Sequence, residues 1–389
     1  MPDPIPASGT VHWLGAGLST GSGLALLADR AERVLSWART PERATARLAR
    51  LGLADRVPVR PLTPDALDAA VGPGDVVVSM LPAGRHPELV RLCRRRDAHF
   101  ACSSYVSPEI EAAAAGARTV VLTEAGLDPG IDHLLAHVLV AQGREAVSGP
   151  AVAHFTSYCG GLPAVPNSFR YRFSWAPAGV LTALLSPARH LTDGLVRTAP
   201  RPWEETRAQR LGAETFEVYP NRDSLPFLDQ YHFPPQWRTE TFVRGTARLP
   251  GWHDAWQPVF AELLGGDRDR IGALAQDLAD RHPMTDDDRD RVVLSVELSL
   301  TGRDGRTWHG GRLLDLVGTE RESAMARCVS LPLAIGVTDI LDGRLEPGLR
   351  RAAENAHDAR RWLRALEGYG VRCVPTDRQP AGCSGPAQD

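Results

Sequence analysis

The stretch Thr10–Thr20, TVHWLGAGLST, decides the fold. Its apolar first half predicts a short strand, and Leu24, Leu26 and Leu27 follow at helical spacing, so the glycines fall between a strand and a helix. Glycines at such a turn let the backbone approach a pyrophosphate at the positive end of the helix. The pattern favours a dinucleotide site, although glycine-rich turns are common and Thr20 stands where a third small residue is usual. The residues predicted to bind the phosphates are Gly15, Ala16, Gly17 and Leu18.

Strands and helices alternate through the sequence that follows, as far as residue 125. Helices are expected between the apolar segments, and this alternation is typical of a doubly wound parallel sheet. We therefore predict an α/β protein whose Rossmann domain covers residues 1–126, with Val78 and Ser79 in its cofactor site. The apolar segments that predict strands are 34–38, 57–59, 75–81, 99–102 and 119–123.

The end of the second predicted strand bears on the choice of cofactor. A site that prefers NAD usually places an acidic residue there to hold the ribose hydroxyls. Here the sequence is Ala38-Arg39-Thr40, which contains no acidic residue. Arg39 can pair with a 2′-phosphate, so we predict NADP as cofactor, with Ala38, Arg39 and Thr40 in contact with it. The alternative is a solvated surface arginine.

The sequence after residue 126 predicts further domains. Expected strands at 152–158, 215–219, 239–243 and 292–301 indicate an α+β substrate domain at 127–250 and 289–322. The polar segment 251–288 has helical patterning and predicts a short helical insert. Whether the helices expected at about 323–370 belong to the first domain is left open. The Pro-, Gly- and Ser-rich stretch 376–389 predicts a disordered tail.

Composition excludes several classes of function. The net charge of -3 offers no basic field for nucleic acid, and no uninterrupted apolar run has the length that crosses a membrane. The six cysteines form no CxxC pair, so we expect no metal, no disulfide framework and a cytoplasmic protein. All 44 basic residues are arginine, which excludes a Schiff-base or general-base lysine. Anionic groups must therefore be held by arginine.

Four later segments combine polar residues with turn formers: 123–133, 157–163, 219–224 and 244–246. The first follows the last Rossmann strand, where the crevice of such a sheet lies, but its Asp-Pro-Gly is also a good turn. The second sets Cys159 before two glycines, and is either a ligand contact or a small buried cysteine with a turn. The last two are predicted to be loops that present an arginine, with a surface salt bridge as the alternative for each.

The order of these motifs resembles that of saccharopine reductase, the glutamate-forming NADP type of the saccharopine dehydrogenase family. The resemblance runs from near residue 11 to about residue 350, which is nearly the whole chain. Several ordered motifs are far more specific than one glycine fingerprint. The matching segments are 79–82 with 86–87, 103–108, 126–133, 157–163, 171–175, 219–224 and 244–246.

The resemblance implies a Rossmann domain, a substrate domain and an inserted helical domain. It also implies the reversible conversion of saccharopine, NADP and water to glutamate, aminoadipate semialdehyde and NADPH. By similarity, the cofactor also contacts Leu127, Pro129, Phe173 and Ser174. The substrate would contact Ser104, Tyr105, Arg222, Gly245, Thr246 and Ala247. The candidates for moving or orienting protons are Asp128, Cys159 and Tyr105, with no single base assigned.

Two other functions are kept as alternatives. The first is a reductive amination enzyme for another amine, such as a carboxynorspermidine-like or specialised amino-acid substrate. The second is a non-catalytic Rossmann protein that senses NADP(H). If the protein is an enzyme, its expected partner is a small-molecule amino-acid substrate. Whether it forms a homodimer is left open.

Overall fold

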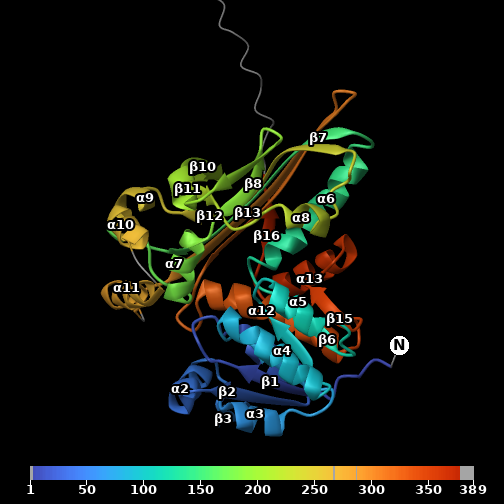
Figure 1. Ribbon diagram of the computed structural model, residues 1–389, viewed down its shortest axis with the longest axis vertical. Helices are drawn as coiled ribbons and strands as arrows, with labels where there is room; N and C mark the ends of the chain where they lie inside the picture. The colour runs from blue at the N-terminus through green and yellow to red at the C-terminus, as the bar shows by residue number, and fades with distance from the viewer. Residues whose placement is uncertain (1–2, 266–267, 286, 377–389) are drawn as a thin grey trace, which may run out of the picture.

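A computed structural model describes residues 3–265, 268–285 and 287–376 and contains two large sheets (Figure 1). Within these residues the first sheet has seven parallel strands in the order β15-β6-β5-β4-β1-β2-β3. Its central strands are apolar and buried along their whole length, as parallel strands covered by helices on both faces should be. The strands are β1 (Thr10–Leu14), β2 (Arg33–Ala38), β3 (Val59–Pro61), β4 (Val76–Ser79), β5 (His99–Cys102), β6 (Val120–Thr123) and β15 (Gly348–Arg351).

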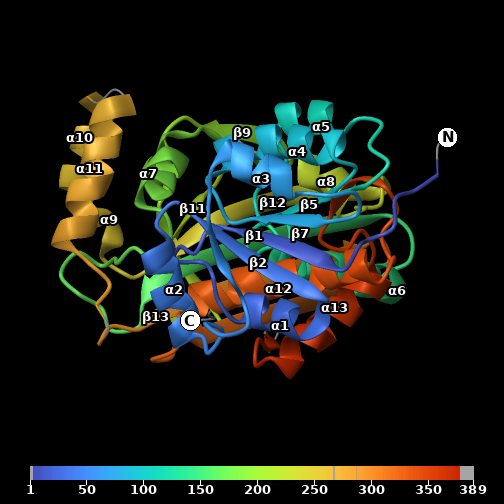
Figure 2. The ribbon, with the colours of Figure 1, turned by 90° about the horizontal axis from the view of Figure 1, so that it is seen from below.

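Helices cover both faces of the first sheet, which makes it doubly wound (Figure 2). The apolar residues of α1, α2, α12 and α13 share one hydrophobic core, and those of α3, α4 and α5 share the other. The helices are α1 (Ser22–Arg30), α2 (Pro41–Arg50), α3 (Pro64–Ala70), α4 (His86–Arg95), α5 (Pro108–Ala114), α12 (Ala324–Leu341) and α13 (Ala356–Gly368).

The C-terminal part of the chain returns to this first sheet. Strand β15 pairs in parallel with β6, and α12 packs against α1 so closely that a Cβ on Gly23 would lie 2.0 Å from the carbonyl oxygen of Ser330. Among the described residues, α12 has the length and composition of a membrane-spanning helix. However, 78% of it is buried inside the protein, where it forms part of the core.

The second sheet is mixed and lies above the first in Figure 1. In the described residues its strand order is β10-β11-β12-β7-β13-β14-β16, with the hairpin β8-β9 beside β12. One face packs on α6 (Ile131–Ala146) and faces the first sheet, and the other carries a small apolar cluster. The strands are β7 (Ala151–Pro163), β8 (Ala188–Thr192), β9 (Leu195–Ala199), β10 (Arg207–Leu211), β11 (Glu214–Pro220), β12 (Trp237–Arg248), β13 (Asp290–Gly302), β14 (Thr307–Val317) and β16 (Cys373–Pro375).

A group of short helices extends from one end of the second sheet (Figure 1). Their aromatic residues stack on one another, with Trp252 beside Tyr219 and Trp256 beside Phe169, and this cluster joins the helices to the sheet. The helices are α7 (Pro177–Leu185), α9 (Trp252–Ala255), α10 (Gln257–Gly265) and α11 (Arg268–Arg281), while α8 (Pro226–Gln230) lies near α6.

Several predicted elements needed correction. The strand expected at 57–59 is β3 at Val59–Pro61, and those expected at 152–158 and 239–243 are parts of the longer β7 and β12. The segment 244–246, predicted to be a loop, therefore lies inside β12. Its glycine is needed there because a Cβ on Gly245 would lie 2.5 Å from the carbonyl oxygen of Tyr219. Apart from Thr376, the predicted tail at 376–389 lies outside the described residues.

Candidate active site

The candidate active site lies where the carboxyl ends of β5 and β6 meet the second sheet. Tyr105 follows β5 and Asp128 follows β6, so the parallel sheet brings both to one edge. The hydroxyl of Tyr105 donates a hydrogen bond to Oδ1 of Asp128 at 2.7 Å. Arg244, from β12 of the second sheet, completes the group.

Arg244 is buried between two carboxylates. Its Nη2 atom lies 2.6 Å from Oδ1 of Asp128, 2.6 Å from Oδ2 of Asp132 and 3.1 Å from the Tyr105 hydroxyl. Its guanidinium carbon lies 3.9 Å from the centre of the Phe227 ring, which gives a cation–π contact. The Arg244 side chain is 2% exposed and that of Asp132 is 0% exposed, so this ion pair is removed from water. Among the described residues, Nε and Nη1 of Arg244 have no hydrogen-bond partner.

These surroundings set the protonation of the group. Burial and the neighbouring Asp132 raise the pKa of Asp128, while Arg244 and the Tyr105 hydroxyl lower it again. Burial raises the pKa of Tyr105 well above its usual value, so the phenol keeps its proton and remains a donor. Asp128 has the more exposed carboxylate, at 12%, and is therefore the acid that can exchange a proton with a ligand.

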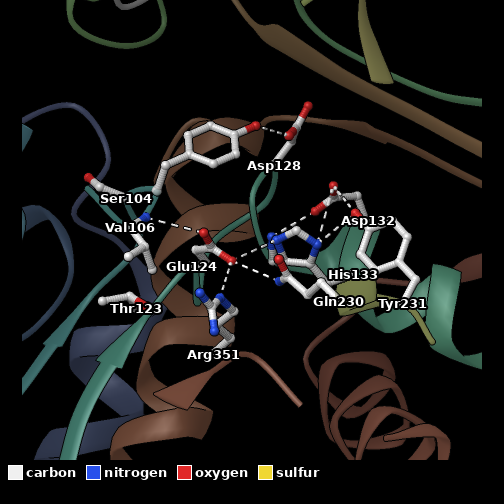
Figure 3. Close-up of polar contacts among 12 residues, drawn as sticks. Ser104, Val106, Thr123, Glu124, Asp128, Asp132, His133, Gln230, Tyr231 and Arg351 are labelled. Carbon is white, nitrogen blue, oxygen red and sulfur yellow. Dashed lines mark hydrogen bonds and ion pairs between the residues drawn. The ribbon is translucent and has the colours of Figure 1, made fainter. Parts of the chain in front are cut away.

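A second set of polar residues, which includes His133 and Tyr231, lies next to Asp132 (Figure 3). Nδ1 of His133 lies 2.7 Å from the hydroxyl of Tyr231, which in turn lies 3.4 Å from Oδ2 of Asp132. Burial lowers the pKa of His133 to about 3 even though the Glu124 carboxylate opposes the shift, so the ring is neutral at physiological pH. The ring also stacks on Phe227, with centroids 5.3 Å apart. His133 is therefore a fixed part of the structure, out of reach of a ligand.

Cys159 lies on the face of the second sheet that carries Arg244. In the parallel register of β12 and β7, Thr246 pairs with Cys159 and Arg244 pairs with Ser157, so all four side chains share that face. Burial and the nearby Asp128 raise the pKa of Cys159 well above the ordinary thiol value. Cys159 is consequently a thiol that can orient a ligand, rather than a thiolate nucleophile.

Arg222 reaches the same group from the loop after β11. It is half-buried, has a left-handed backbone with φ 57°, and its guanidinium carbon lies 5.0 Å from the centre of the Tyr105 ring. The neighbouring Asp223 pairs instead with Arg189, at 2.8 Å. The guanidinium of Arg222 thus lies beside Tyr105, one of the catalytic candidates.

The predicted phosphate loop lies between β1 and α1. Gly15 has φ 96°, and a Cβ added to Gly17 would meet no atom within 4 Å, so the loop leaves open space for a phosphate. Thr20 is buried and its hydroxyl donates to the carbonyl of Gly15, whereas the close approach expected of a third glycine occurs at Gly21. There, Oε1 of Glu322 accepts a hydrogen bond from the first N–H group of α1 at 2.5 Å.

The other predicted cofactor and substrate residues differ in how exposed they are and in whether they lie near the site. Arg39 and Thr40 are exposed at the end of β2, next to buried Ala38, and Val78 and Ser79 are buried in β4. Leu127 and Pro129 are buried on either side of Asp128. The structure does not bring two side chains to the site: Phe173 packs in the aromatic cluster of the short helices, and Ala247 lies in the apolar cluster on the opposite face of the sheet. Ser174 is buried near Gly161, and Ser104 is half-buried beside Tyr105.

Comparison with known proteins assigns the chain to a family. Residues 11–123 match the saccharopine dehydrogenase NADP binding domain, and residues 126–371 match the saccharopine dehydrogenase C-terminal domain. The chain belongs to the saccharopine dehydrogenase family. Strands β1 to β6 and the Gly15–Thr20 loop thus lie in the NADP-binding domain, whereas β15 of the same sheet and Arg244 lie in the matched C-terminal domain.

Relatives in this family extend over nearly the same length. The NADP-dependent, glutamate-forming saccharopine dehydrogenase of Pyricularia oryzae is 28% identical, over 94% of this chain and 98% of its own. The enzyme of the same name from Saccharomyces cerevisiae is 31% identical over 73% of this chain and 80% of its own. A solved structure of the apo glutamate-forming enzyme from Saccharomyces cerevisiae has a TM-score of 0.77 at 28% identity, covering 94% of this chain and 99% of that one.

Several residues of the candidate site in this saccharopine dehydrogenase family member have no role predicted from the sequence. Asp132 and His133 were part of a recognised motif, but nothing in the spacing showed that Asp132 binds Arg244. Arg244 follows Phe242-Val243 in a strand that also carries Arg238, Glu240 and Arg248, so its position alone gave no sign that it is buried and paired. Tyr231 and Glu124 come from distant segments, and only the fold brings both of them to His133.

Proposed function

We propose that this protein is an NADP-dependent oxidoreductase that converts saccharopine, NADP and water to glutamate, aminoadipate semialdehyde and NADPH, and the reverse. The observation that carries this proposal is the buried group of Tyr105, Asp128 and Arg244 at the junction of the two domains. Family membership and relatives of that name along nearly the whole chain support it.

The residues of the first domain fit an NADP molecule. The open space at Gly17 and the left-handed backbone of Gly15 suit a pyrophosphate, and Arg39 suits a 2′-phosphate. When bound, NADP supplies the acceptor for the hydride that leaves the C–N carbon of the substrate. Glu322 already accepts from the first N–H group of α1, so the N–H groups of the preceding loop would be the ones to hold the phosphates.

The residues of the site handle protons and charge. In the oxidative direction, the secondary amine of the substrate loses a proton and its C–N carbon loses a hydride; water then adds and the C–N bond breaks. Asp128, with its raised pKa and its partly exposed side chain, can accept the proton and return it to the leaving amine. Tyr105 and Arg244 hold Asp128 in place, and Cys159 lies on the adjoining sheet face as a neutral hydrogen-bonding group.

Arg222 is expected to anchor a substrate carboxylate. Arg222→Ala should raise KM for saccharopine by about ten- to a hundredfold, which corresponds to the roughly 1.5–3 kcal/mol of a charged hydrogen bond. The melting temperature and the affinity for NADPH should not change, because Asp223 is paired with Arg189 and loses nothing. Arg189→Ala, which removes that nearby ion pair, is the matched control and should leave KM unaltered. An Arg222→Ala protein with the KM of the wild type would contradict the assignment.

Arg39 is expected to set the preference for NADP over NAD. The wild type should have the higher kcat/KM with NADP, and Arg39→Ala should reduce that preference by about ten- to a hundredfold through loss of a charged hydrogen bond. Arg43→Ala, at a second exposed arginine four residues further on, should leave the preference intact. Equal use of both cofactors by the wild type would rule the idea out.

The reaction itself is tested by the oxidation of NADPH. Aminoadipate semialdehyde is supplied with glutamate and, separately, with a panel of other amino donors, and absorbance at the NADPH band is followed. Glutamate should give the highest kcat/KM. A different preferred donor would replace the proposed substrate, and NADPH binding without turnover by any pair would indicate a sensor.

A further inference from the structure

The backbone of Glu124 has an unusual conformation. The residue directly follows β6, its φ is 56°, and it is 3% exposed. Left-handed backbone is unfavourable for a residue with a Cβ, and glycine is the usual occupant. A buried glutamate is kept in such a conformation only when its contacts fix it, and strain of this kind gathers at functional sites. The contacts of Glu124 therefore indicate what it does.

Glu124 binds the chain on both sides of Tyr105. Its backbone N–H donates to the carbonyl oxygen of Ser104 at 3.0 Å, and its Oε1 atom accepts from the N–H of Val106 at 3.2 Å. A residue with right-handed or extended backbone at this position would direct its side chain elsewhere, so the left-handed φ is what lets one residue hold both neighbours of Tyr105. The loop that carries the Tyr105 hydroxyl is thereby fixed to Glu124, which directly follows β6 and lies four residues before Asp128.

The other oxygen of Glu124 faces the second domain (Figure 3). Oε2 accepts a hydrogen bond from Nε2 of Gln230 at 2.9 Å and lies 3.5 Å from Nε2 of His133. It also pairs with Nε of Arg351, in β15, at 3.3 Å. One carboxylate thus connects the Tyr105 loop to α6 and α8, the helices next to the Arg244 group.

We propose that Glu124 is a positioning residue for the reaction: it fixes the Tyr105 hydroxyl against Asp128 and fixes that pair against the second domain. This inference rests on the proposed function. Glu124 does not touch the substrate, and its effect reaches the chemistry through Tyr105. A purely structural alternative is that Glu124 only neutralises Arg351, in which case removing its carboxylate would lower stability and leave kcat per folded molecule unchanged.

Three variants separate these roles. Glu124→Ala removes the carboxylate, and Glu124→Gly removes it while relieving the backbone. Glu124→Gln keeps an oxygen that can accept from Val106. A misplaced catalytic group reduces turnover by about a hundredfold, so both truncations should lower kcat to that extent, with the affinity for NADPH within about twofold of the wild type. Glu124→Gln keeps the bond to Val106 but turns an NH2 group towards the donors of Gln230 and Arg351, so it should restore kcat only to within about tenfold.

The controls use a second residue with the same backbone. Asp97 has φ 53° and precedes β5 at the opposite, amino-terminal edge of the sheet, so Asp97→Ala and Asp97→Gly should leave kcat unaltered. Hydrogen–deuterium exchange provides a readout that needs no turnover: the Val106 amide should exchange faster in Glu124→Ala and keep its protection in Glu124→Gln. Truncated variants with the kcat of the wild type, or with an unchanged Val106 exchange rate, would overturn the proposal. Failure of the wild type to oxidise NADPH would instead count against the proposed function, and the exchange result would still decide the role of Glu124.

Discussion

Asp128→Asn is expected to lower kcat by about a hundredfold or more, because positioned acid–base groups contribute roughly 10²–10⁴-fold. Asparagine keeps the shape of the side chain and can still accept from Tyr105, but it cannot take a proton. Binding of NADPH, measured by fluorescence titration, should stay within about twofold of the wild type, since the predicted phosphate contacts are Gly15 to Leu18, after β1, and do not include Asp128. A fall of less than about fivefold would remove Asp128 from the mechanism.

The same substitution should make the protein more stable at neutral pH. The pKa of Asp128 is raised in the folded state, mainly by burial and by Asp132. A carboxyl group with a raised folded pKa stabilises the fold below its unfolded pKa and loses that contribution as the pH rises through the folded value. Ionised Asp128 therefore lowers the stability of the folded wild type. The free energy of unfolding of Asp128→Asn should exceed that of the wild type by an amount that grows as the pH rises above the ordinary pKa range of aspartate. Urea unfolding at several pH values measures this, with Asp223→Asn, which removes a largely exposed ion pair with Arg189, as control.

Arg244→Met is expected to destabilise the protein by about 3–5 kcal/mol, the effect of removing one partner of a buried ion pair. Asp128 and Asp132 would then be two buried carboxylates without Arg244, and the pKa of Asp128, which burial and Asp132 raise and Arg244 lowers, would rise further. The loss of stability should consequently be smaller near pH 5 than at pH 8, as followed by urea unfolding. Arg244→Lys should recover only part of it, because Nη2 of arginine contacts three oxygens in a fixed geometry.

A combined variant distinguishes the stabilising and catalytic effects of Arg244. Adding Asp128→Asn and Asp132→Asn to Arg244→Met removes the unpaired charges, so most of the lost stability should return while activity stays low. If Arg244→Met is as stable as the wild type at pH 8, the carboxylates do not depend on Arg244 and the description of the ion pair is wrong.

The elements of the first domain could be predicted because each carries a strong local signal. Buried strands such as Val76–Ser79 are continuous apolar runs between turn formers, and the glycine loop is recognisable by its place between a strand and a helix. The second sheet was harder. The sequence predicts a turn after Cys159 and a loop at Gly245, because glycine next to polar residues usually marks a turn, whereas Gly245 lies inside β12 and allows close packing against Tyr158 and Tyr219.

Only part of the candidate site could be predicted, namely the residues that lie in local motifs. Tyr105, Asp128 and Arg222 lie in recognisable motifs, and the structure brings them together. The pairing of Arg244 with Asp132, and of Glu124 with Gln230, depends on contacts between residues more than a hundred positions apart. No periodicity or spacing in a single sequence encodes such contacts, so they followed only from the fold.

The return of the C-terminal segment to the first sheet has a consequence for how the chain folds as it is synthesised. Strand β6 gains its outer neighbour, and Gly23 its packing partner, only from residues beyond 323. The nucleotide-binding half is therefore incomplete while the ribosome is still translating the second domain, with an open sheet edge and an apolar face of α1 exposed. We expect a nascent chain that ends before α12 to be protease-sensitive and to depend on chaperones until the last helices emerge.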